Sequence, residues 1–500
     1  MEEVIVDGGP LTPTQVSDVA YRRAMARPGE DLDARLEPAR AVVDRAVVSG
    51  DVVYGITTGF GALANTHIGR EETEALQYNL LRSHASGVGE PVPDELVRAM
   101  LLLRARTLSQ GHSGVRPLIV RKLLEMLERN ILPVVPSQGS VGASGDLAPF
   151  AHLALPLIGE GDVKVDGRVV PASESGLEPI DLKTKEGLSL LNGTEGMTAM
   201  GVLALGMCRD LVLAADVAAA MSVEALLGSA RPFQPEVHRL RPHPGQAISA
   251  ARIARLLENS PIVASHADDF DHAVQDAYSL RCAPQVHGAV ADTLDHLEAV
   301  VSIEMGSVVD NPIVFPDTGD VISGGNFHGQ PLAFALDFAT IAVSELASIS
   351  ERRTDRLLDP ARSQGLPPFL AQEAGVNSGY MLTQYVQAAL VAENRILSHP
   401  ASIDSIPTSG NQEDHVSMGW GAGKKLFDVI GNVRRVIAIE LLCATQGLDY
   451  RKPLTPAKGT GRVAELIRDR IPTLTQDRSL SSDIESVASM IQDKSISALV

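Results

Sequence analysis

The chain has 500 residues, of which 44% are hydrophobic and 21% charged, and its formal net charge is −19. These proportions exclude a disordered chain, and the length calls for two or three subdomains or one large helical assembly. A chain this acidic repels polyanions, so we expect no nucleic acid partner. The three cysteines, Cys208, Cys282 and Cys443, are far apart, which argues for a reducing compartment and against a thiolate metal cluster.

No segment of the sequence predicts secretion or a membrane span. The N-terminus, "MEEVIVDGGP", has no long apolar run, so it does not read as a secretory signal. Charged residues interrupt the most apolar stretches, such as 201–228, before they reach the uncharged length of a membrane helix. We therefore expect a cytoplasmic protein without a membrane partner.

The first 130 residues mix short β-prone and helical patterns. The stretch "EEVIVDGG" (2–9) predicts a strand, and Thr12 or Thr14 can cap the helix that follows. Next, "VVYGITTGFGALAN" (52–65) predicts a strand that runs into a glycine-rich loop. Helices are then expected over roughly 71–86, 94–111 and 114–130.

A run of small residues, "SQGSVGASGDLAPFAH" at 137–152, surrounds Ser144 with glycine and alanine. It is not a phosphate-binding loop, because that motif needs a lysine and none lies between Lys122 and Lys164. It is not the hydrolase elbow G-x-S-x-G, because Asp146 stands where the last glycine belongs. A tight turn in which Asp146 begins a helix remains open.

A chemical interpretation of the same run also remains open. If the turn brings the Gly145 amide nitrogen onto the Ala143 carbonyl carbon, a five-membered ring can close, and loss of two waters leaves an imidazolone. Ser144 then becomes an exocyclic methylene, because its hydroxyl is the group eliminated. Ala143 and Gly145 are small enough for this close approach, and glycine relieves the backbone strain. The product is an electrophile that no ordinary side chain supplies.

The rest of the chain predicts one hairpin and a bundle of helices. The stretch "GDVKVDGRVVPA" (161–172) alternates around a central Asp-Gly, which is typical of a β-hairpin. Three long stretches are helix-compatible and apolar around most of their circumference: 185–228, 330–357 and 423–448. Such helices must be buried on several sides, so we expect a common bundle rather than three unrelated core helices.

Agreement with a known family appears once the motifs are taken together. The run "GSVGASGDLAPFAH" closely resembles the signature of the aromatic amino acid ammonia-lyases and related aminomutases, which form a methylidene-imidazolone (MIO) group from this tripeptide. Seven more motifs match in order along the chain: "YGITTGFG" (54–61), "LLNGT" (190–194), "QDAYSLRCAPQV" (275–286), "DNP" (310–312), "GGNFHG" (324–329), "GLPPFL" (365–370) and "NQEDHVSMG" (411–419). Chance agreement of so many motifs is negligible, so the turn-only interpretation falls away.

The resemblance implies a fold and an assembly. The fold is mainly α, a long-helix bundle of the fumarase/aspartase-like type with a small mixed N-terminal domain that carries the MIO. We expect three parts, at 1–185, 186–450 and a helical cap at 451–500. The resemblance also implies a homotetramer whose active sites are shared between subunits, and the apolar helices fit this because extra helix faces must be buried. A mobile inner loop around Tyr54 is implied as well.

The resemblance further implies roles for individual residues. Ala143, Ser144 and Gly145 would form the MIO. Tyr54 matches the catalytic tyrosine, and since a phenol has a pKa near ~10, neighbours must lower it for Tyr54 to act as a base. Arg281 would grip the substrate carboxylate with two hydrogen bonds. Four more residues match positions that the family places around the MIO and substrate: Asn192 and Tyr278, which can hydrogen-bond the MIO oxygen or the amine, with Gln275 and Phe327.

Two positions bear on the substrate. His84 in "RSHASG" and Glu413 in "NQEDHVSM" match the histidine-specific members of the family, whereas the phenylalanine-specific members usually carry glutamine at the second position. An imidazole brings a donor and an acceptor into a pocket, and His84 with Glu413 can satisfy both. The resemblance therefore implies elimination of ammonia from L-histidine to give trans-urocanate, with His84 and Glu413 binding the ring.

Several alternatives compete with this interpretation. The nearest is a phenylalanine or tyrosine ammonia-lyase, or an MIO aminomutase, and "RPHPGQ" (241–246) is a stretch also seen in tyrosine lyases. A fumarase/aspartase-type enzyme lacks support because its "GSSxMPxKxN" loop is absent, and an inactive homologue would need a broken tripeptide or a lost tyrosine. The acidic run "HADDFDH" (266–272) has no known ligand spacing, so we expect no metal.

Overall fold

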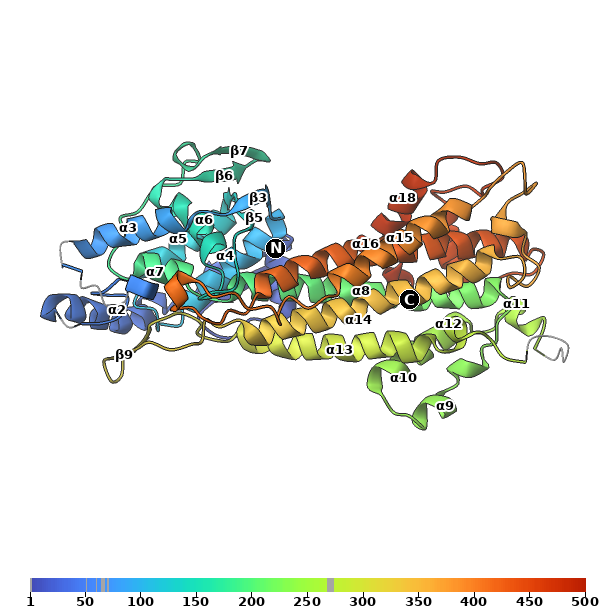
Figure 1. Ribbon diagram of the computed structural model, residues 1–500, viewed down its shortest axis with the longest axis horizontal. Helices are drawn as coiled ribbons and strands as arrows, with labels where there is room; N and C mark the ends of the chain where they lie inside the picture. Colours follow the sequence, from blue (N-terminus) through green and yellow to red (C-terminus); the bar gives the residue numbers. More distant parts are fainter. Residues whose placement is uncertain (1, 51, 60, 64–67, 70–71, 268–273) are drawn as a thin grey trace. The chain divides into compact units, whose positions relative to one another are not determined.

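The computed structural model describes residues 2–50, 52–59, 61–63, 68–69, 72–267 and 274–500. Figure 1 shows a mainly helical chain with a few short strands, which confirms the predicted fold class. The chain divides into two compact units, each built from three segments. Unit 1 consists of 1–203, 297–336 and 400–424, and unit 2 consists of 204–296, 337–399 and 425–500. Neither unit ends at 185 or 450, and the three-part division at those residues stays a prediction.

Unit 1 begins with a small mixed layer. Strand β1 (Glu2–Val6) pairs in parallel with β2 (Ala24–Pro28), and α1 (Pro13–Ala20) lies between them in sequence. The predicted strand is confirmed, and so is the cap, because the Thr12 hydroxyl accepts the Gln15 N–H at 3.2 Å. Helix α2 (Leu32–Ser49) follows.

The strand predicted at the start of 52–65 is wrong for the residues described there. Residues 54–57 form a turn in which the Val53 carbonyl accepts the N–H groups of Ile56 and Thr57, at 3.1 and 3.0 Å. Gly55 has a φ of 71°, which favours glycine and bends the chain out of the extended form. A short 3₁₀ helix, η1 (Gly61–Leu63), comes next.

The three predicted helices of this unit are confirmed with ends shorter by a few residues, as α3 (Thr73–His84), α4 (Asp94–Leu108) and α5 (Pro117–Glu128). Short strands connect them: β3 (Val88–Pro91) pairs with β5 (Pro136–Gln138), and β4 (Leu132–Pro133) joins the hairpin strands β6 (Asp162–Val165) and β7 (Arg168–Pro171). The predicted hairpin is confirmed. Its turn residues Asp166 and Gly167 have φ of 49° and 78°, as a tight Asp-Gly turn requires.

Unit 1 contains several further short elements. They are α6 (Leu147–Ala154), η3 (Leu155–Ile158), η4 (Ala172–Glu174), α7 (Glu186–Leu191), the antiparallel pair β8 (Ile313–Phe315) and β9 (Asp320–Ile322), and η7 (Ser409–Asn411). Helix α3 packs against both α6 and α7.

Four of the five boundaries between the units fall within long helices: α8 (Glu195–Ala225), α13 (Ala283–Glu304), α14 (Gln330–Leu358) and α16 (Gly419–Tyr450). Three of them confirm the predicted apolar stretches, except that the stretch 185–228 is broken at 192–194 into α7 and α8. Within unit 2, residues 214–225 of α8 and 436–448 of α16 are all buried, so these helices have no solvent face there. Helix α13 was not predicted, because acidic residues such as Asp292, Asp295 and Glu298 interrupt its apolar pattern.

Helix α14 corrects one expectation about composition. Among the residues that the structure describes, it is a helix long and apolar enough to cross a membrane, although we expected no such stretch. Of its most apolar 18-residue window, 61% is buried within the protein, as in the core helix of a bundle.

Unit 2 is completed by shorter helices. They are η5 (Arg231–Phe233), α9 (Pro235–Arg239), α10 (Pro244–Leu256), α11 (Pro261–Ala264), α12 (Tyr278–Arg281), η6 (Pro368–Leu370), α15 (Met381–Leu397), α17 (Lys458–Arg468), α18 (Ser481–Gln492) and η8 (Ser497–Leu499).

Candidate active site

The small-residue run forms a strained turn just before α6. Gly142, Ser144 and Gly145 have φ of 73°, 48° and 81°. A serine pays a steric cost in this left-handed region, so the turn needs the surrounding structure to hold it. Asp146 occupies the N-cap position of α6, as the sequence suggested.

The turn is held by the backbone of Gly193. The Gly193 N–H donates to the Ser144 carbonyl at 3.1 Å, and the Asp146 N–H donates to the Gly193 carbonyl at 2.9 Å. Gly145 and Gly193 lie so close that a Cβ on Gly145 would overlap the Gly193 backbone. The backbone of Gly193 therefore leaves room only for a glycine at 145. Ala143 and Ser144, which have small side chains, lie in the tight turn that ring closure needs. These residues fit an MIO group.

A second backbone contact ties the turn to the segment that carries Glu413. The Met418 N–H donates to the Val141 carbonyl at 2.9 Å. A Cβ on Gly142 would collide with the Ser417 hydroxyl. Two segments far apart in sequence, 141–146 and 413–418, thus lie against each other within unit 1.

Asp146 is a buried carboxyl group beside the turn. Its Oδ2 accepts the Met197 N–H at 2.8 Å, and Ser140 donates to Oδ1 at 3.4 Å. Burial raises the pKa of Asp146 from 3.8 to about 7, and the nearby Glu195 carboxyl acts in the same direction. Both effects favour the protonated acid.

This raised pKa predicts a pH dependence of stability. The folded chain holds the Asp146 proton up to about pH 7, whereas the unfolded chain releases it near pH 4. The contribution of this group to the free energy of unfolding is therefore complete below about pH 4 and is lost as the pH rises to about 7. We expect Asp146→Asn to flatten the fall in urea-unfolding midpoint between those pH values. An equally steep fall in the variant would contradict the assignment.

Asn192 lies next to the glycine that holds the turn. It follows α7, only 4% of its surface is exposed, and its Nδ2 donates to the Asn311 carbonyl at 2.7 Å. This bond fixes the amide plane and uses one of the two Nδ2 protons, so the other proton and Oδ1 can serve a ligand.

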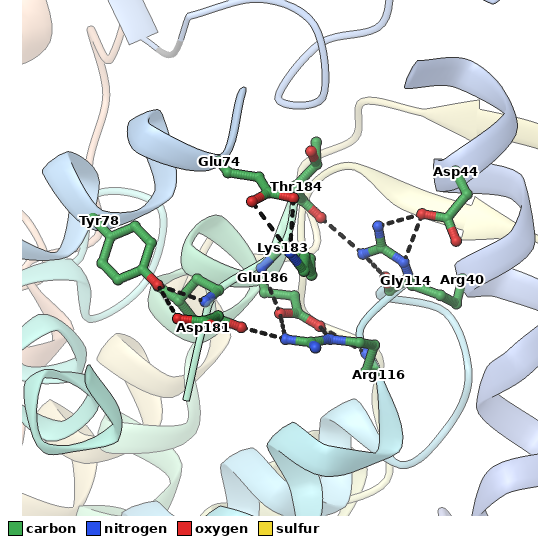
Figure 2. Close-up of polar contacts among 11 residues, drawn as sticks. Arg40, Asp44, Glu74, Tyr78, Gly114, Arg116, Asp181, Lys183, Thr184 and Glu186 are labelled. Carbon is green, nitrogen blue, oxygen red and sulfur yellow. Dashed lines mark hydrogen bonds and ion pairs between the residues drawn. The ribbon is translucent and has the colours of Figure 1, made fainter. Parts of the chain in front are cut away.

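The segment before α7 is held by a polar network (Figure 2). Arg116 donates to both carboxylate oxygens of Glu186, from its backbone N–H at 3.0 Å and from Nη2 at 2.8 Å. Arg40 donates from Nη1 to the Thr184 carbonyl at 2.9 Å. These contacts set the start of α7, and a helix of six residues transmits that position directly to Asn192 at its end.

Asn311 joins Asn192 to the loop that carries Phe327. The Asn311 carbonyl accepts from Asn192, and the Asn311 side-chain Oδ1 accepts the Gly324 N–H at 2.9 Å. Phe327 is half-buried in the same loop. The sequence singled out the "DNP" motif but assigned Asn311 no role, since a backbone carbonyl carries no residue signature.

A second group of predicted residues gathers around Glu413. Its carboxylate acts electrostatically on the Tyr54 phenol and on the His84 imidazole, so the three side chains are near neighbours. Thr408 donates from Oγ1 to Glu413 Oε2 at 2.8 Å and pairs with it through the backbone. No hydrogen bond from a described residue engages the other carboxylate oxygen, Oε1, so it can accept one from a ligand.

The pKa of Tyr54 is raised, chiefly by burial and also by Glu413, although the Gly61 N–H acts against this. Of the neighbours that the structure describes, only Gly61 lowers the pKa of Tyr54, so the lowered pKa that a base needs stays a prediction. A buried phenol beside a carboxylate favours its neutral form.

His84 ends α3, and burial lowers its pKa, which favours the neutral ring. Its Nδ1 lies 2.9 Å from the Leu80 carbonyl and 3.0 Å from the Ser83 hydroxyl. The Leu80 carbonyl can accept a hydrogen bond from a protonated Nδ1, and the Ser83 hydroxyl can donate a hydrogen bond to an unprotonated Nδ1. Nε2 can therefore present either a lone pair or a proton to a ligand.

The last three predicted residues lie in unit 2, on or beside α12. Gln275 is exposed, and the Tyr278 ring is 72% exposed. The Arg281 guanidinium lies 4.6 Å from the centre of the Tyr278 ring, and its Nε donates to the Asp276 carbonyl at 2.9 Å. Among the residues that the structure describes, no hydrogen bond or ion pair engages the two terminal nitrogens of Arg281, so they can bind a carboxylate. The structure thus brings Tyr54, His84, Asn192, Phe327 and Glu413 into unit 1 with the turn, and groups the other three in unit 2.

Comparisons with known proteins agree with this geometry. The family model "Aromatic amino acid lyase" matches residues 11–469. The chain belongs to the aromatic amino acid lyase family. It is 54% identical to the histidine ammonia-lyase of Gloeobacter violaceus over 94% of this chain and 93% of that protein. It is 55% identical to the histidine ammonia-lyase of Deinococcus radiodurans over 90% and 86% of the two chains.

Solved structures of aromatic amino acid lyases and aminomutases share the fold. Histidine ammonia-lyase from Trypanosoma cruzi is 42% identical, with a TM-score of 0.91 over 99% of this chain and 94% of that chain. Tyrosine aminomutase from Streptomyces globisporus is 38% identical, with a TM-score of 0.94 over 99% and 98%. Membership of this lyase family makes the chain a carbon–nitrogen lyase, and it implies an MIO group in general.

The acidic run 266–272 lies largely outside the described residues, which include only His266 and Ala267 of it. Among the residues that are described, no group of three or more histidine, cysteine, aspartate or glutamate side chains could hold a metal ion.

Proposed function

We propose that the chain is a histidine ammonia-lyase, which eliminates ammonia from L-histidine to give trans-urocanate. The observation that carries this proposal is that Glu413 and His84 lie in the unit that holds the Ser144 turn, near enough for the carboxylate to act electrostatically on the imidazole. Relatives named histidine ammonia-lyase at about half identity support it. A phenyl ring in place of the imidazole would leave the Glu413 carboxylate without a partner, which a site of this kind rejects strongly.

The prosthetic group in this proposal is MIO, formed from Ala143-Ser144-Gly145. It would supply an electrophilic methylidene carbon that helps ammonia leave and acidifies the Cβ proton. Asn192 is placed to donate its second Nδ2 proton toward that group or toward the substrate amine, because the first is held by the Asn311 carbonyl. Phe327 offers an aromatic face from the loop that Asn311 holds.

The other proposed roles follow from the side chains. Arg281 binds the substrate carboxylate through its two terminal nitrogens, since Nε is already used. Gln275 and Tyr278 lie beside it and donate to the substrate or its amine. Tyr54 takes the Cβ proton on its phenolic oxygen, and the ammonium group of the bound substrate is a cation that can lower its pKa.

The direct test measures ammonia and the conjugated acid after separate incubation with L-histidine, L-phenylalanine and L-tyrosine. Urocanate from histidine alone supports the proposal. Cinnamate or coumarate would keep the MIO chemistry and remove the ring-binding role of His84 and Glu413. Because the tyrosine aminomutase match is also close, the products are checked for a β-amino acid, whose formation without free ammonia would indicate a mutase instead.

We further propose a homotetramer with active sites shared between subunits. Two observations support this: the Tyr278 ring is largely exposed, and an apolar groove runs along α13 and α14 in unit 2. Exposed apolar side chains line or flank that groove, including Phe338 and Ile341. Surfaces of this kind are typically covered by another copy of the chain.

Mixing two inactive variants tests the sharing of sites. We expect Tyr54→Phe and Arg281→Met to be almost inactive alone. If each site takes Tyr54 and Arg281 from different subunits, tetramers co-expressed from both variants regain activity. Random assembly predicts about a quarter of the wild-type rate, since one site in four then has both native residues. Mixed tetramers with no activity would mean that both residues come from one subunit.

A further inference from the structure

The glycine that holds the turn is itself held from behind. Gly193 has a φ of 141°, and its backbone pairs with the 144–146 turn on one side. On the other side, a Cβ at Gly193 would lie 2.8 Å from Arg104 Nη2 and would overlap the Glu195 carboxylate. Gly193 therefore lies between the turn and the buried ion pair of Arg104 and Glu195.

Arg104, on α4, contacts residues of three other helices near Gly193: α6, α7 and α8. Its Nη1 donates to the Asn192 carbonyl at 2.5 Å and to the Ser189 carbonyl at 3.3 Å, which caps the end of α7. Its Nη2 pairs with Glu195 at the start of α8, at 2.8 Å. Its guanidinium stacks 4.3 Å from the centre of the Phe150 ring on α6. The side chain is completely buried, so all these contacts act without competition from water.

We propose that Arg104 is a positioning residue for formation of the electrophile. Arg104 binds the Asn192 carbonyl and lies against Gly193, and it thereby fixes the backbone that holds the Ala143-Ser144-Gly145 turn in position. It does not touch the reacting atoms of the turn. This inference rests on the proposed function, because it concerns the same prosthetic group.

The step that depends on this position is a ring closure with loss of two waters. The Gly145 nitrogen bonds to the Ala143 carbonyl carbon. The Ala143 oxygen leaves as water with the hydrogens of the Gly145 and Ser144 nitrogens, and the Ser144 hydroxyl leaves as a second water with its Cα hydrogen. No oxidant or reductant is needed. Attack of this kind requires the nitrogen within near-contact distance of the carbon, so a small shift of the supporting backbone slows it strongly.

The chain supplies a matched control on the same helix. Arg106 is also buried on α4, but it donates to the carbonyls of Gly8, Gly9, Gly306 and Ser307, and none of its hydrogen bonds reaches the turn or Gly193. Replacing either arginine by lysine keeps the charge and removes a planar fork that binds several carbonyls. The two variants should therefore lose similar amounts of stability.

The experiment measures intact mass of the full-length wild-type, Arg104→Lys and Arg106→Lys chains at intervals after synthesis, together with their thermal unfolding midpoints. We expect wild-type and Arg106→Lys chains to lack the mass of two waters. We expect water loss in Arg104→Lys to be slower by about tenfold or more, because the charge-assisted hydrogen bonds that fix the backbone at 192–193 are lost. Glu195→Gln keeps the side-chain volume and removes the charge that pairs with Arg104. It replaces Arg104→Lys in the experiment if that variant does not fold, and we expect it to slow water loss as well.

The outcomes separate the inference from the proposed function. Equal rates of water loss in all variants overturn the role of Arg104. Slower water loss in Arg106→Lys by the same factor also overturns it, since general destabilisation would then be the cause. A wild-type chain that never loses two waters overturns the proposed function itself.

Discussion

Replacement of Ser144 by alanine is expected to abolish ammonia release, with kcat lower by at least about a thousandfold. The reason is chemical. Alanine has no hydroxyl to eliminate, so the second water cannot leave and no methylidene forms. The turn itself should persist, because its hydrogen bonds to Gly193 come from the backbone. The measurement pairs the rate of urocanate formation with intact mass, and the Ser144→Ala chain should lie at most one water below the mass of its own sequence.

Ser140→Ala is the matched control for this experiment. Ser140 lies in the same run, and its hydroxyl bonds to the Gly142 N–H at 3.2 Å and to Asp146 at 3.4 Å, but it is not part of the tripeptide. We expect that chain to lose both waters and keep most of its activity. A fully active Ser144→Ala enzyme would rule out the MIO assignment.

Replacement of Glu413 by glutamine is expected to lower kcat/KM for L-histidine by about a hundredfold, because a charge-assisted hydrogen bond to the ring is lost. Glutamine keeps the length of the side chain and can still accept from Thr408 Oγ1, so the fold around 408–413 should be unchanged. The preference for histidine over phenylalanine should narrow at the same time, since the uncompensated carboxylate no longer rejects a phenyl ring.

Asp414→Asn separates this effect from a loss of surface charge. Asp414 is the adjacent carboxylate and is exposed. Its removal changes the net charge by the same amount and should leave histidine kinetics within about twofold of wild type. Unchanged histidine kinetics in Glu413→Gln would mean that the ring does not bind this carboxylate, whatever the result for Ser144.

Features that depend on neighbouring residues alone were predictable. The Thr12 cap and the Asp166-Gly167 turn each follow from the chemistry of one or two side chains. The long apolar helices were predictable for the same reason, because a helix that is apolar all round has to be buried. Helix α13 escaped this argument because its acidic residues break the apolar pattern.

Predictions failed where local preference competed with a turn. The valines before Tyr54 favour a strand, but the N–H groups of Ile56 and Thr57 and the side chain of Thr57 close hydrogen bonds with Val53 that an extended chain cannot make. Propensity is a weak preference, and a few specific bonds override it.

The motifs of this chain, taken in order, were enough to predict the family through the resemblance that they carry, together with the tripeptide that can cyclise and the pair His84 and Glu413 that the resemblance implies. The raised pKa of Tyr54, the pKa of about 7 at Asp146 and the position of Arg104 behind Gly193 could be established only in three dimensions. Proton affinity depends on burial and on charges a few ångströms away, and those neighbours come from distant parts of the sequence.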